Sequence, residues 1–284
     1  MGETVVANAM DASSMFWNPA LLAQIPKKTV IGVSNTQYHA DVRLNYLALS
    51  QQVGSFKFGA NVLTMDSGEM DVTTEFQPFG TGESFKVFDF SFGLTVAQAL
   101  TDLFSYGVTG RFVQENIASV SNSTIVFDAG IFYRIGNTGA QMAVAIRSFG
   151  FDSSSDGTIE RTVVGDPGVV VENSFEQITA PTTFMLGLTY QLFRGSERNS
   201  LLLSGQLNNP NDNSESFNFG VEYVWNDMLA LRGGYRVGVE EISAPSFGVG
   251  LTVPGLGPDI RFDYGFSQLE RLGSVHRIGL DIQM

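Results

Sequence analysis

The chain has 284 residues, of which 43% are hydrophobic and only 16% charged, and its formal net charge is −13. The abundance of large apolar residues excludes an intrinsically disordered chain, and the acidic balance argues against a nucleic-acid partner. The sequence has no cysteine and only two histidines, His39 and His276. Thiol chemistry and multi-histidine metal sites are therefore excluded, and we expect neither a metal nor a cofactor.

The first 28 residues show no strand periodicity. Asp11 is followed by Ala, Ser and Ser, which suggests a capped helical turn. The step from Asn18 to Pro19 then interrupts it. Irregular, partly apolar backbone is not tolerated in lipid, so we expect residues 1–28 to fold as a hatch inside the domain that follows.

Beyond residue 28, apolar residues alternate with polar ones over about fourteen segments, which is the periodicity of β-strands. In one of them, Leu229, Leu231 and Tyr235 lie at odd positions, with Arg232 and Arg236 at even positions. Most segments are about 9–13 residues long, which suits a tilted membrane-spanning strand of about 9–11 residues better than the average globular strand of about 5–6. The predicted strands span 29–38, 41–52, 56–65, 85–97, 104–115, 123–135, 140–148, 182–193, 200–208, 216–225, 228–240, 244–253, 259–268 and 274–284.

The connections between these segments alternate in length. Short turns such as 226–227 are interleaved with longer polar loops, the longest being 66–84 and 149–181. Short turns at one rim and long loops at the other are typical of outer-membrane barrels. We therefore predict an all-β protein, a single 14-stranded antiparallel transmembrane β-barrel over residues 29–284 with the hatch, residues 1–28, in its lumen. A soluble β-sandwich or double-layer barrel is the alternative.

This fold predicts residence in a Gram-negative outer membrane, where lipid surrounds the barrel. The first four residues have neither the basic start nor the apolar core of a signal peptide. Because such a barrel must cross the inner membrane, we expect Met1 to be internal to a precursor or to follow a removed leader.

Charged residues at the polar positions of the strands are predicted to face the lumen. Inside a barrel a charge is costly unless it is hydrated or paired. One interpretation is an ion-pair network that clamps the hatch against the wall, and a sharper one is a track whose arginines hold the head group of an amphipathic carboxylate. The set is Arg43, Arg111, Asp128, Arg134, Glu222, Arg232, Arg236, Glu240, Arg261 and Asp263.

Catalysis has little support in the sequence. A serine–histidine–aspartate arrangement would have to use His276, which begins the last predicted strand, and no G-x-S-x-G nucleophile turn occurs. We therefore expect a protein that is not an enzyme and has no catalytic residues.

The N-terminal motif resembles the hatch of a known family. Residues 11–23 read Asp-Ala-Ser-Ser-Met-Phe-Trp-Asn-Pro-Ala-Leu-Leu-Ala, which is similar to the hatch motif of FadL-like outer-membrane proteins, most of all in the PorV/PorQ branch. Its centre is Trp17, Asn18, Pro19 and Ala20, and Asn18 and Pro19 are expected to fix the bend of the hatch. Segments 262–266 and 272–280 also resemble this branch, although the chain ends on Met284 where members often end on an aromatic residue.

The resemblance implies a fourteen-stranded barrel and two alternative functions. PorV-type proteins work with the type IX secretion system, and the terminal motifs favour this reading slightly; its partners would be secretion components or secreted cargo. FadL-type proteins conduct fatty acids and other hydrophobic small molecules. A purely structural outer-membrane protein is a third possibility.

Overall fold

The computed structural model describes residues 1–162, 169–172, 177, 179–193, 198–239, 244–253, 258–270 and 273–284. These residues form long antiparallel strands and two short helices, α1 (Ser14–Trp17) and the 3₁₀ helix η1 (Pro19–Gln24). Within these ranges no helix is long and apolar enough to cross a membrane.

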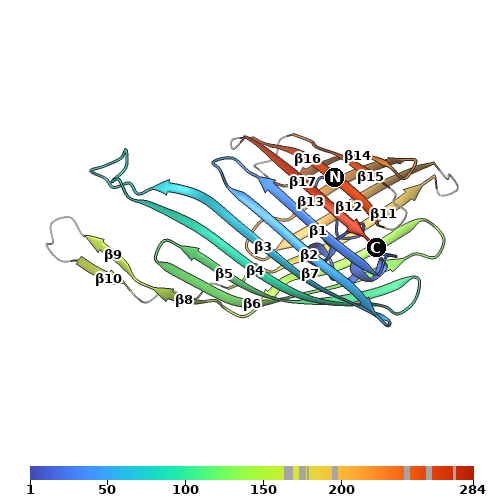
Figure 1. Cartoon of the computed structure of the whole chain (residues 1–284), viewed down its shortest axis with the longest axis horizontal. Helices are drawn as coiled ribbons and strands as arrows, with labels where there is room; N and C mark the ends of the chain where they lie inside the picture. Colours follow the sequence, from blue (N-terminus) through green and yellow to red (C-terminus); the bar gives the residue numbers. More distant parts are fainter. Residues whose placement is uncertain are drawn as a thin grey trace.

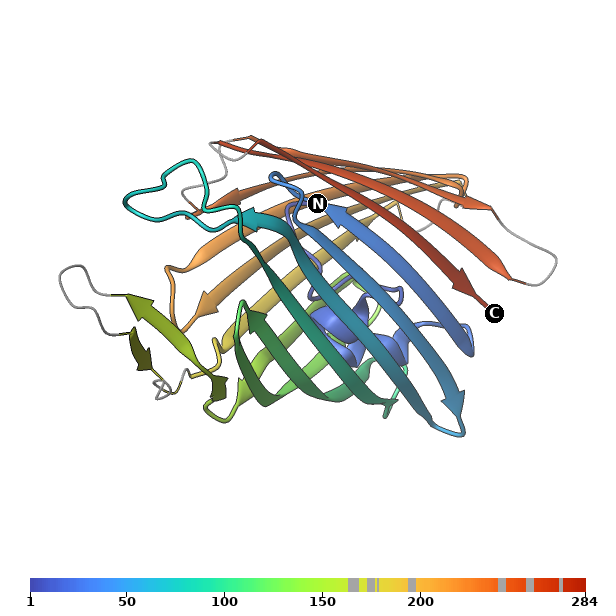
Figure 2. The ribbon, with the colours of Figure 1, turned by 60° about the vertical axis from the view of Figure 1, so that its left-hand side comes forward.

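Fourteen long strands close into an antiparallel barrel (Figure 1, Figure 2). Strands adjacent in the chain pair with each other, β7 pairs directly with β11, and β17 pairs with β1 to close the sheet on itself. The predicted all-β fold, a single 14-stranded antiparallel barrel, is thereby confirmed. The barrel strands are β1 (Thr29–Gln37), β2 (Arg43–Val53), β3 (Phe56–Asp71), β4 (Ser84–Ala99), β5 (Phe104–Ile117), β6 (Val120–Arg134), β7 (Ala140–Gly150), β11 (Thr183–Leu192), β12 (Asn199–Pro210), β13 (Ser216–Trp225), β14 (Leu229–Val237), β15 (Ser246–Val253), β16 (Asp259–Leu269) and β17 (Gly273–Gln283).

The two ends of the barrel differ. Short turns lie at the end where β1 begins and β17 ends, which we call the short-turn rim; the opposite end is the long-loop rim. At the long-loop rim β3 and β4 continue into the predicted loop 66–84, and the predicted loop 149–181 contains β8 (Ser154–Gly157), β9 (Ile159–Thr162) and β10 (Val169–Glu172). β8 pairs with β6, while β9 and β10 form a hairpin that projects beyond the barrel (Figure 1). Backbone hydrogen bonds pair the strands in these elements although their side chains do not alternate apolar with polar.

Side chains that face outward from the barrel are large and apolar. On β13, Phe217 and Phe219 are 48% and 56% exposed, whereas Asn218 between them is fully buried. The same alternation leaves aliphatic and aromatic side chains exposed on most of the other barrel strands. An apolar outer surface of this extent is unfavourable in water and is the surface that a lipid-facing barrel presents.

On strand β2 one side chain points in the direction opposite to the predicted one. Its even positions face inward, where the Tyr46 hydroxyl donates to a carbonyl of the N-terminal segment at 3.0 Å, and its odd positions Leu47 and Leu49 face outward. Arg43 shares the odd parity and is exposed, opposite Asp66 of β3 in the ladder. The prediction that Arg43 faces the lumen is therefore wrong, because both faces of this strand are apolar and alternation alone does not identify the inner one.

The N-terminal segment, residues 1–28, lies against the inner wall of the barrel (Figure 2). Its apolar side chains are buried between it and the strands: Met15 and Leu22 in one cluster with Val30 of β1, and Leu21 in another with Phe132 of β6. Polar contacts join it to strands on opposite sides of the barrel. It therefore occupies part of the lumen, and the candidate site is the space that remains beside it.

Candidate functional site in the lumen

Local hydrogen bonds shape the N-terminal segment before it touches the wall. The carboxylate of Asp11 accepts hydrogen bonds from the backbone and hydroxyl of Ser13, at 2.9 and 2.5 Å, just before α1 begins. Four residues later the chain bends at Asn18, whose side chain accepts from the backbone N–H of Ala20 at 3.0 Å, with Pro19 in the first turn of η1. An asparagine cap followed by proline is a favoured helix start, because the cap satisfies an otherwise unpaired N–H and proline has none to satisfy.

The bend is fixed against strands β5 and β6. Asn18 is fully buried, and its amide nitrogen donates to the carbonyls of Val6 at 2.8 Å and of Ile131 at 3.4 Å. Two wall glycines make this approach possible: a Cβ at Gly107 would lie 2.5 Å from the Pro19 carbonyl carbon, and one at Gly130 would lie 2.0 Å from the Asn18 side-chain oxygen. The structure thus gives Asn18 and Pro19 contacts within the segment and with the wall.

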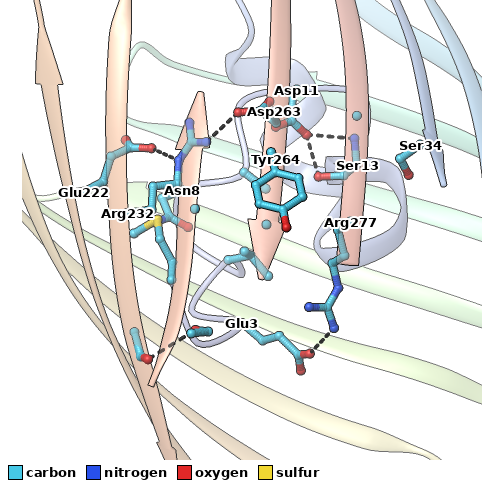
Figure 3. A pocket seen from close by; sticks show the side chains of 18 of the residues that line it. Glu3, Asn8, Asp11, Ser13, Ser34, Glu222, Arg232, Asp263, Tyr264 and Arg277 are labelled. Atoms are coloured by element: carbon cyan, nitrogen blue, oxygen red, sulfur yellow. Dashed lines mark hydrogen bonds and ion pairs between the residues drawn. The ribbon is translucent and has the colours of Figure 1, made fainter. Parts of the chain in front are cut away.

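A chain of ion pairs joins the segment to strands β13, β14 and β16. Arg232 lies between Glu222 and Asp263, as Figure 3 shows, and the guanidinium of Arg261 bonds Asp263 at 2.6 Å and also pairs with Asp11. Every charged side chain in this series of ion pairs has at least one opposite charge beside it. The four strand residues of this network, Glu222, Arg232, Arg261 and Asp263, line the cavity inside the barrel.

A second set of ion pairs holds the beginning of the segment. Glu3 pairs with Arg236 of β14 at 2.7 Å and with Arg277 of β17 at 3.6 Å, the latter drawn in Figure 3. Arg277 also donates to the hydroxyl of Ser267 at 3.0 Å. Arg277 was absent from the predicted set, although it has the same strand parity as the buried Asp281.

The environment of Asp11 favours its charged form. Burial alone would raise the pKa of this carboxyl, but the positive charge of Arg261 and the hydrogen bonds from Ser13 outweigh it and hold the pKa below its ordinary value of 3.8. The ion pair with Arg261 is therefore intact at neutral pH.

A separate cluster lies on the opposite wall. Asp128 of β6 is fully buried and pairs with Arg111 of β5 at 2.5 Å. Its other oxygen accepts from the backbone N–H of Ser148 at 2.7 Å. Beside this pair, Arg147 of β7 lies over the Phe16 ring, 3.9 Å from its centroid. The sequence prediction missed Arg147, although it shares its parity with the buried Ala143 and Ala145 of the same strand.

The remaining predicted residues do not join these clusters. Arg134 ends β6 at the short-turn rim, where its guanidinium approaches the carbonyl of Asp102 at 3.4 Å. Arg43 faces outward, as described above. Glu240 lies outside the described residues. In the part of the chain that the structure describes, no three acidic or histidine side chains are grouped so as to hold a metal.

A cavity of about 560 Å³ separates the N-terminal segment from the wall formed mainly by β1 and β14–β17 (Figure 3). On the segment side it is lined by apolar residues such as Val5, Ala9 and Met10 together with Trp17. On the wall side it is lined by the ion-paired arginines and carboxylates and by small residues such as Ser34. The cavity therefore combines apolar surface with charged side chains, and the arginines among them are ion-paired.

Sequence comparison finds no match: no protein-family profile and no curated protein sequence corresponds to this chain. Solved structures do match. The toluene transporter TbuX of Ralstonia pickettii gives a TM-score of 0.64 at 13% identity, over 99% of this chain and 95% of that one. A toluene transporter of Pseudomonas putida, TodX, gives 0.63 at 14% identity over 95% and 92%.

A FadL homologue of Pseudomonas aeruginosa also matches, with a TM-score of 0.58 at 12% identity over 99% of this chain and 95% of that one. Identities this low describe architecture only. The chain has the fold of the FadL-type barrels over almost its whole length.

Proposed function

We propose that this protein is a non-enzymatic outer-membrane channel that passes hydrophobic small molecules. The observation that carries the proposal is the cavity of about 560 Å³ inside a barrel whose outer surface is apolar. Its volume lies within the roughly 300–1,000 Å³ of typical small-molecule sites. Its apolar lining residues, such as Val5, Ala9 and Met10, offer a surface for the body of a hydrophobic ligand. The fold shared with the toluene transporters supports the same reading.

The N-terminal segment acts in this proposal as the hatch of the channel. It is tied to the wall by apolar packing and by the ion pairs of Glu3 and Asp11. A segment that fills part of the lumen restricts the path of water and ions, while the cavity beside it leaves room for a small apolar solute. Asn18 and Pro19 serve to fix the bend of this hatch.

The secretion-linked function rests on different support. The motifs at both chain ends resemble the PorV/PorQ branch and favour an accessory of type IX secretion. The structural comparison favours the channel instead, since the matching solved structures include toluene transporters and a FadL homologue. We therefore place the channel first, which reverses the preference drawn from the motifs. Native mass spectrometry after mild detergent extraction distinguishes the two, because a secretion accessory would retain a partner protein and a channel a small hydrophobic ligand or lipid.

The channel function is tested by uptake into whole cells. A Gram-negative host lacking its own barrels of this fold should take up radiolabelled toluene and a medium-chain fatty acid faster when it expresses the protein. The empty vector is the control, and barrel assembly is verified by heat-dependent migration on gels. Uptake no faster than in the control for every hydrophobic probe, with assembled barrel in the outer membrane, would contradict the proposal.

A further inference from the structure

Asp281 of β17 is the exception among the carboxylates that line the cavity. The others each pair with at least one arginine: Glu3, Asp11, Glu222 and Asp263. Within the described residues Asp281 forms no ion pair, although it is only 6% exposed. Its oxygens accept hydrogen bonds from the backbone N–H of Ala12 at 3.0 Å and from the amide of Gln283 at 2.8 Å. Both donors are uncharged, so this carboxylate is enclosed without a counter-charge, which is unfavourable.

Free space adjoins this carboxylate. Asp281 lines the cavity of about 560 Å³, and so do its small neighbours Gly32, Ser34 and Gly279. In the ladder between β1 and β17, Gly32 lies opposite Asp281 and Ser34 lies opposite Gly279. Because these neighbours are small, a ligand in the cavity can approach Asp281 from the lumen.

Aromatic residues line the same cavity. The hydroxyl of Tyr46 donates to the carbonyl of Ala12 at 3.0 Å, and the N–H of Ala12 bonds Asp281, so the tyrosine and the carboxylate meet at one residue of the N-terminal segment. Trp17 of the same segment also lines the cavity. Tyrosine and tryptophan rings attract cations through their π faces. A carboxylate near such rings is suited to binding an organic ammonium group.

The charges of the cavity lining favour a cation over an anion. Five lining carboxylates face four guanidinium groups, which belong to Arg232, Arg236, Arg261 and Arg277. Each of these arginines already pairs with a protein carboxylate. A ligand carboxylate would have to displace one of those partners, whereas a ligand ammonium would supply the counter-charge that Asp281 lacks.

The long-loop rim, at the entrance to the barrel, is acidic. In the part of the chain that the structure describes, the exposed arginine and lysine residues of this rim are Arg43 and Lys86. The hairpin of β3 and β4 alone carries more exposed acidic residues than that: Glu69, Asp71, Glu75 and Glu83. The cavity extends toward this rim, since Thr36 and Ser267, near the rim ends of β1 and β16, line it. An entrance with one sign of charge concentrates solutes of the opposite sign.

We propose that the channel prefers amphipathic amines, whose ammonium group pairs with Asp281 and whose apolar body lies against lining residues such as Val5, Ala9 and Met10. The ammonium group donates hydrogen bonds to the carboxylate and lies near the aromatic rings. The acidic rim raises the concentration of such cations at the entrance. This inference rests on the proposed channel function and adds a charge preference, whereas the toluene named for the matching structures is uncharged.

Tryptophan fluorescence tests this preference directly. The chain has two tryptophans, and Trp225→Phe leaves Trp17, in the cavity lining, as the only reporter. Detergent-purified protein is titrated at pH 7 with 2-phenylethylamine, 2-phenylethanol and phenylacetate, which have similar apolar bodies but differ in charge. We expect the amine to bind about tenfold more tightly than the alcohol, which corresponds to about 1.4 kcal/mol, and phenylacetate to bind most weakly. Equal affinities for the amine and the alcohol, or a preference for phenylacetate, would overturn the proposal.

A substitution of Asp281 identifies the residue responsible. Asp281→Asn removes the charge and keeps a side-chain oxygen for the N–H of Ala12, so the amine should then bind no more tightly than the alcohol. Asp102→Asn makes the same change on an exposed turn of the short-turn rim and should leave the ratio unchanged. A preference that survives Asp281→Asn contradicts the assignment. An equal loss of affinity for amine and alcohol gives Asp281 a structural role and contradicts it too.

A second variant tests the same charge with Asp281 intact. Ser34→Lys places an ammonium group on the cavity wall, two residues along β1 from the position opposite Asp281. It should weaken binding of the amine relative to the alcohol at least severalfold. Ser34→Met, which has a long side chain without charge, is the matched control and should keep the preference. An unchanged ratio in Ser34→Lys would overturn the proposal even if Asp281→Asn failed to assemble.

Uptake separates this inference from the function on which it rests. Toluene uptake by cells that express the parent protein reports on the channel alone. If that uptake fails, the channel function fails. If it succeeds and the purified parent protein shows no preference for the amine, only the assignment of Asp281 fails.

Discussion

Asp11 of the N-terminal segment and Arg261 of β16 form an ion pair across 250 residues of sequence. Arg261 also bonds Asp263, which in turn pairs with Arg232. The segment is thus attached to the same network that forms the polar side of the cavity. Its position inside the barrel depends on a few ionised side chains as well as on apolar packing.

Replacing Asp11 with asparagine should loosen the segment without opening the barrel. Asp11→Asn removes the ion pair and leaves Arg261 with only part of its counter-charge, at a cost of about 1–3 kcal/mol for groups that are mostly buried. The expected result is faster proteolysis of the segment in detergent-purified protein, with the barrel itself still resistant. Unchanged protection of the segment would show that the ion pair between Asp11 and Arg261 does not hold it in place.

The same contact should respond to acid in a defined direction. Because the pKa of Asp11 lies below 3.8 in the folded protein, folding favours its ionised form, and the stabilisation is present at neutral pH. It is lost as the pH falls below the ordinary carboxyl value and through the lowered one. In the Trp225→Phe background, Trp17 emission should stay constant from pH 7 to about 4 and change below that. Asp11→Asn should lack this transition, and an identical acid transition in both proteins would contradict the assignment.

The wall glycine at 107 should be intolerant of a side chain. In Gly107→Ala the new Cβ would lie within 2.6 Å of both carbonyl atoms of Pro19, which belong to backbone and cannot rotate away. The bend of the segment must shift, so we expect increased hydrogen exchange of the backbone N–H of Ala20 and its neighbours. Gly205→Ala on β12 is the matched control, since its Cβ would meet no atom within 4 Å. Equal behaviour of the two variants would show that the segment does not press against β5.

The buried side chain of Asn18 should contribute more to the stability of the N-terminal segment than an exposed asparagine does. Asn18→Ala loses a cap worth about 0.5–2 kcal/mol and leaves the Val6 carbonyl without its donor. Hydrogen exchange across residues 5–24 should accelerate. Asn35→Ala on β1 removes only an exposed side-chain contact with Asn45 and serves as the control. An effect of Asn35→Ala as large as that of Asn18→Ala would argue against the cap.

Much of the barrel could be predicted from the sequence because each strand has two different surroundings. Lipid outside and a polar lumen inside impose alternation, and β13 shows it without exception from Phe217 to Val221. The prediction failed on β2, where the N-terminal segment covers the inner face and makes it apolar too, so that Arg43 was assigned to the lumen. Strand extensions at the long-loop rim were missed because their side chains do not alternate apolar with polar.

The sequence predicts which types of charged residue face the lumen, but it predicts less well which of them form ion pairs with each other. Strand parity identified Arg232, Arg261 and Asp263 as lumen residues. Whether a given arginine is paired depends on contacts between distant strands and on one bulge. The left-handed conformation of Ser148, which directs its N–H to Asp128, leaves no signal in the sequence.

The most direct test of the channel is to fill its cavity. Ser34 of β1 lines the cavity, and Ser34→Trp would occupy much of the free space without adding charge. Leu47→Trp on β2 places the same side chain on the lipid-facing surface as a control. In whole cells with equal amounts of assembled barrel, Ser34→Trp should reduce toluene uptake at least severalfold and Leu47→Trp should not. Full uptake by Ser34→Trp would contradict passage through the cavity.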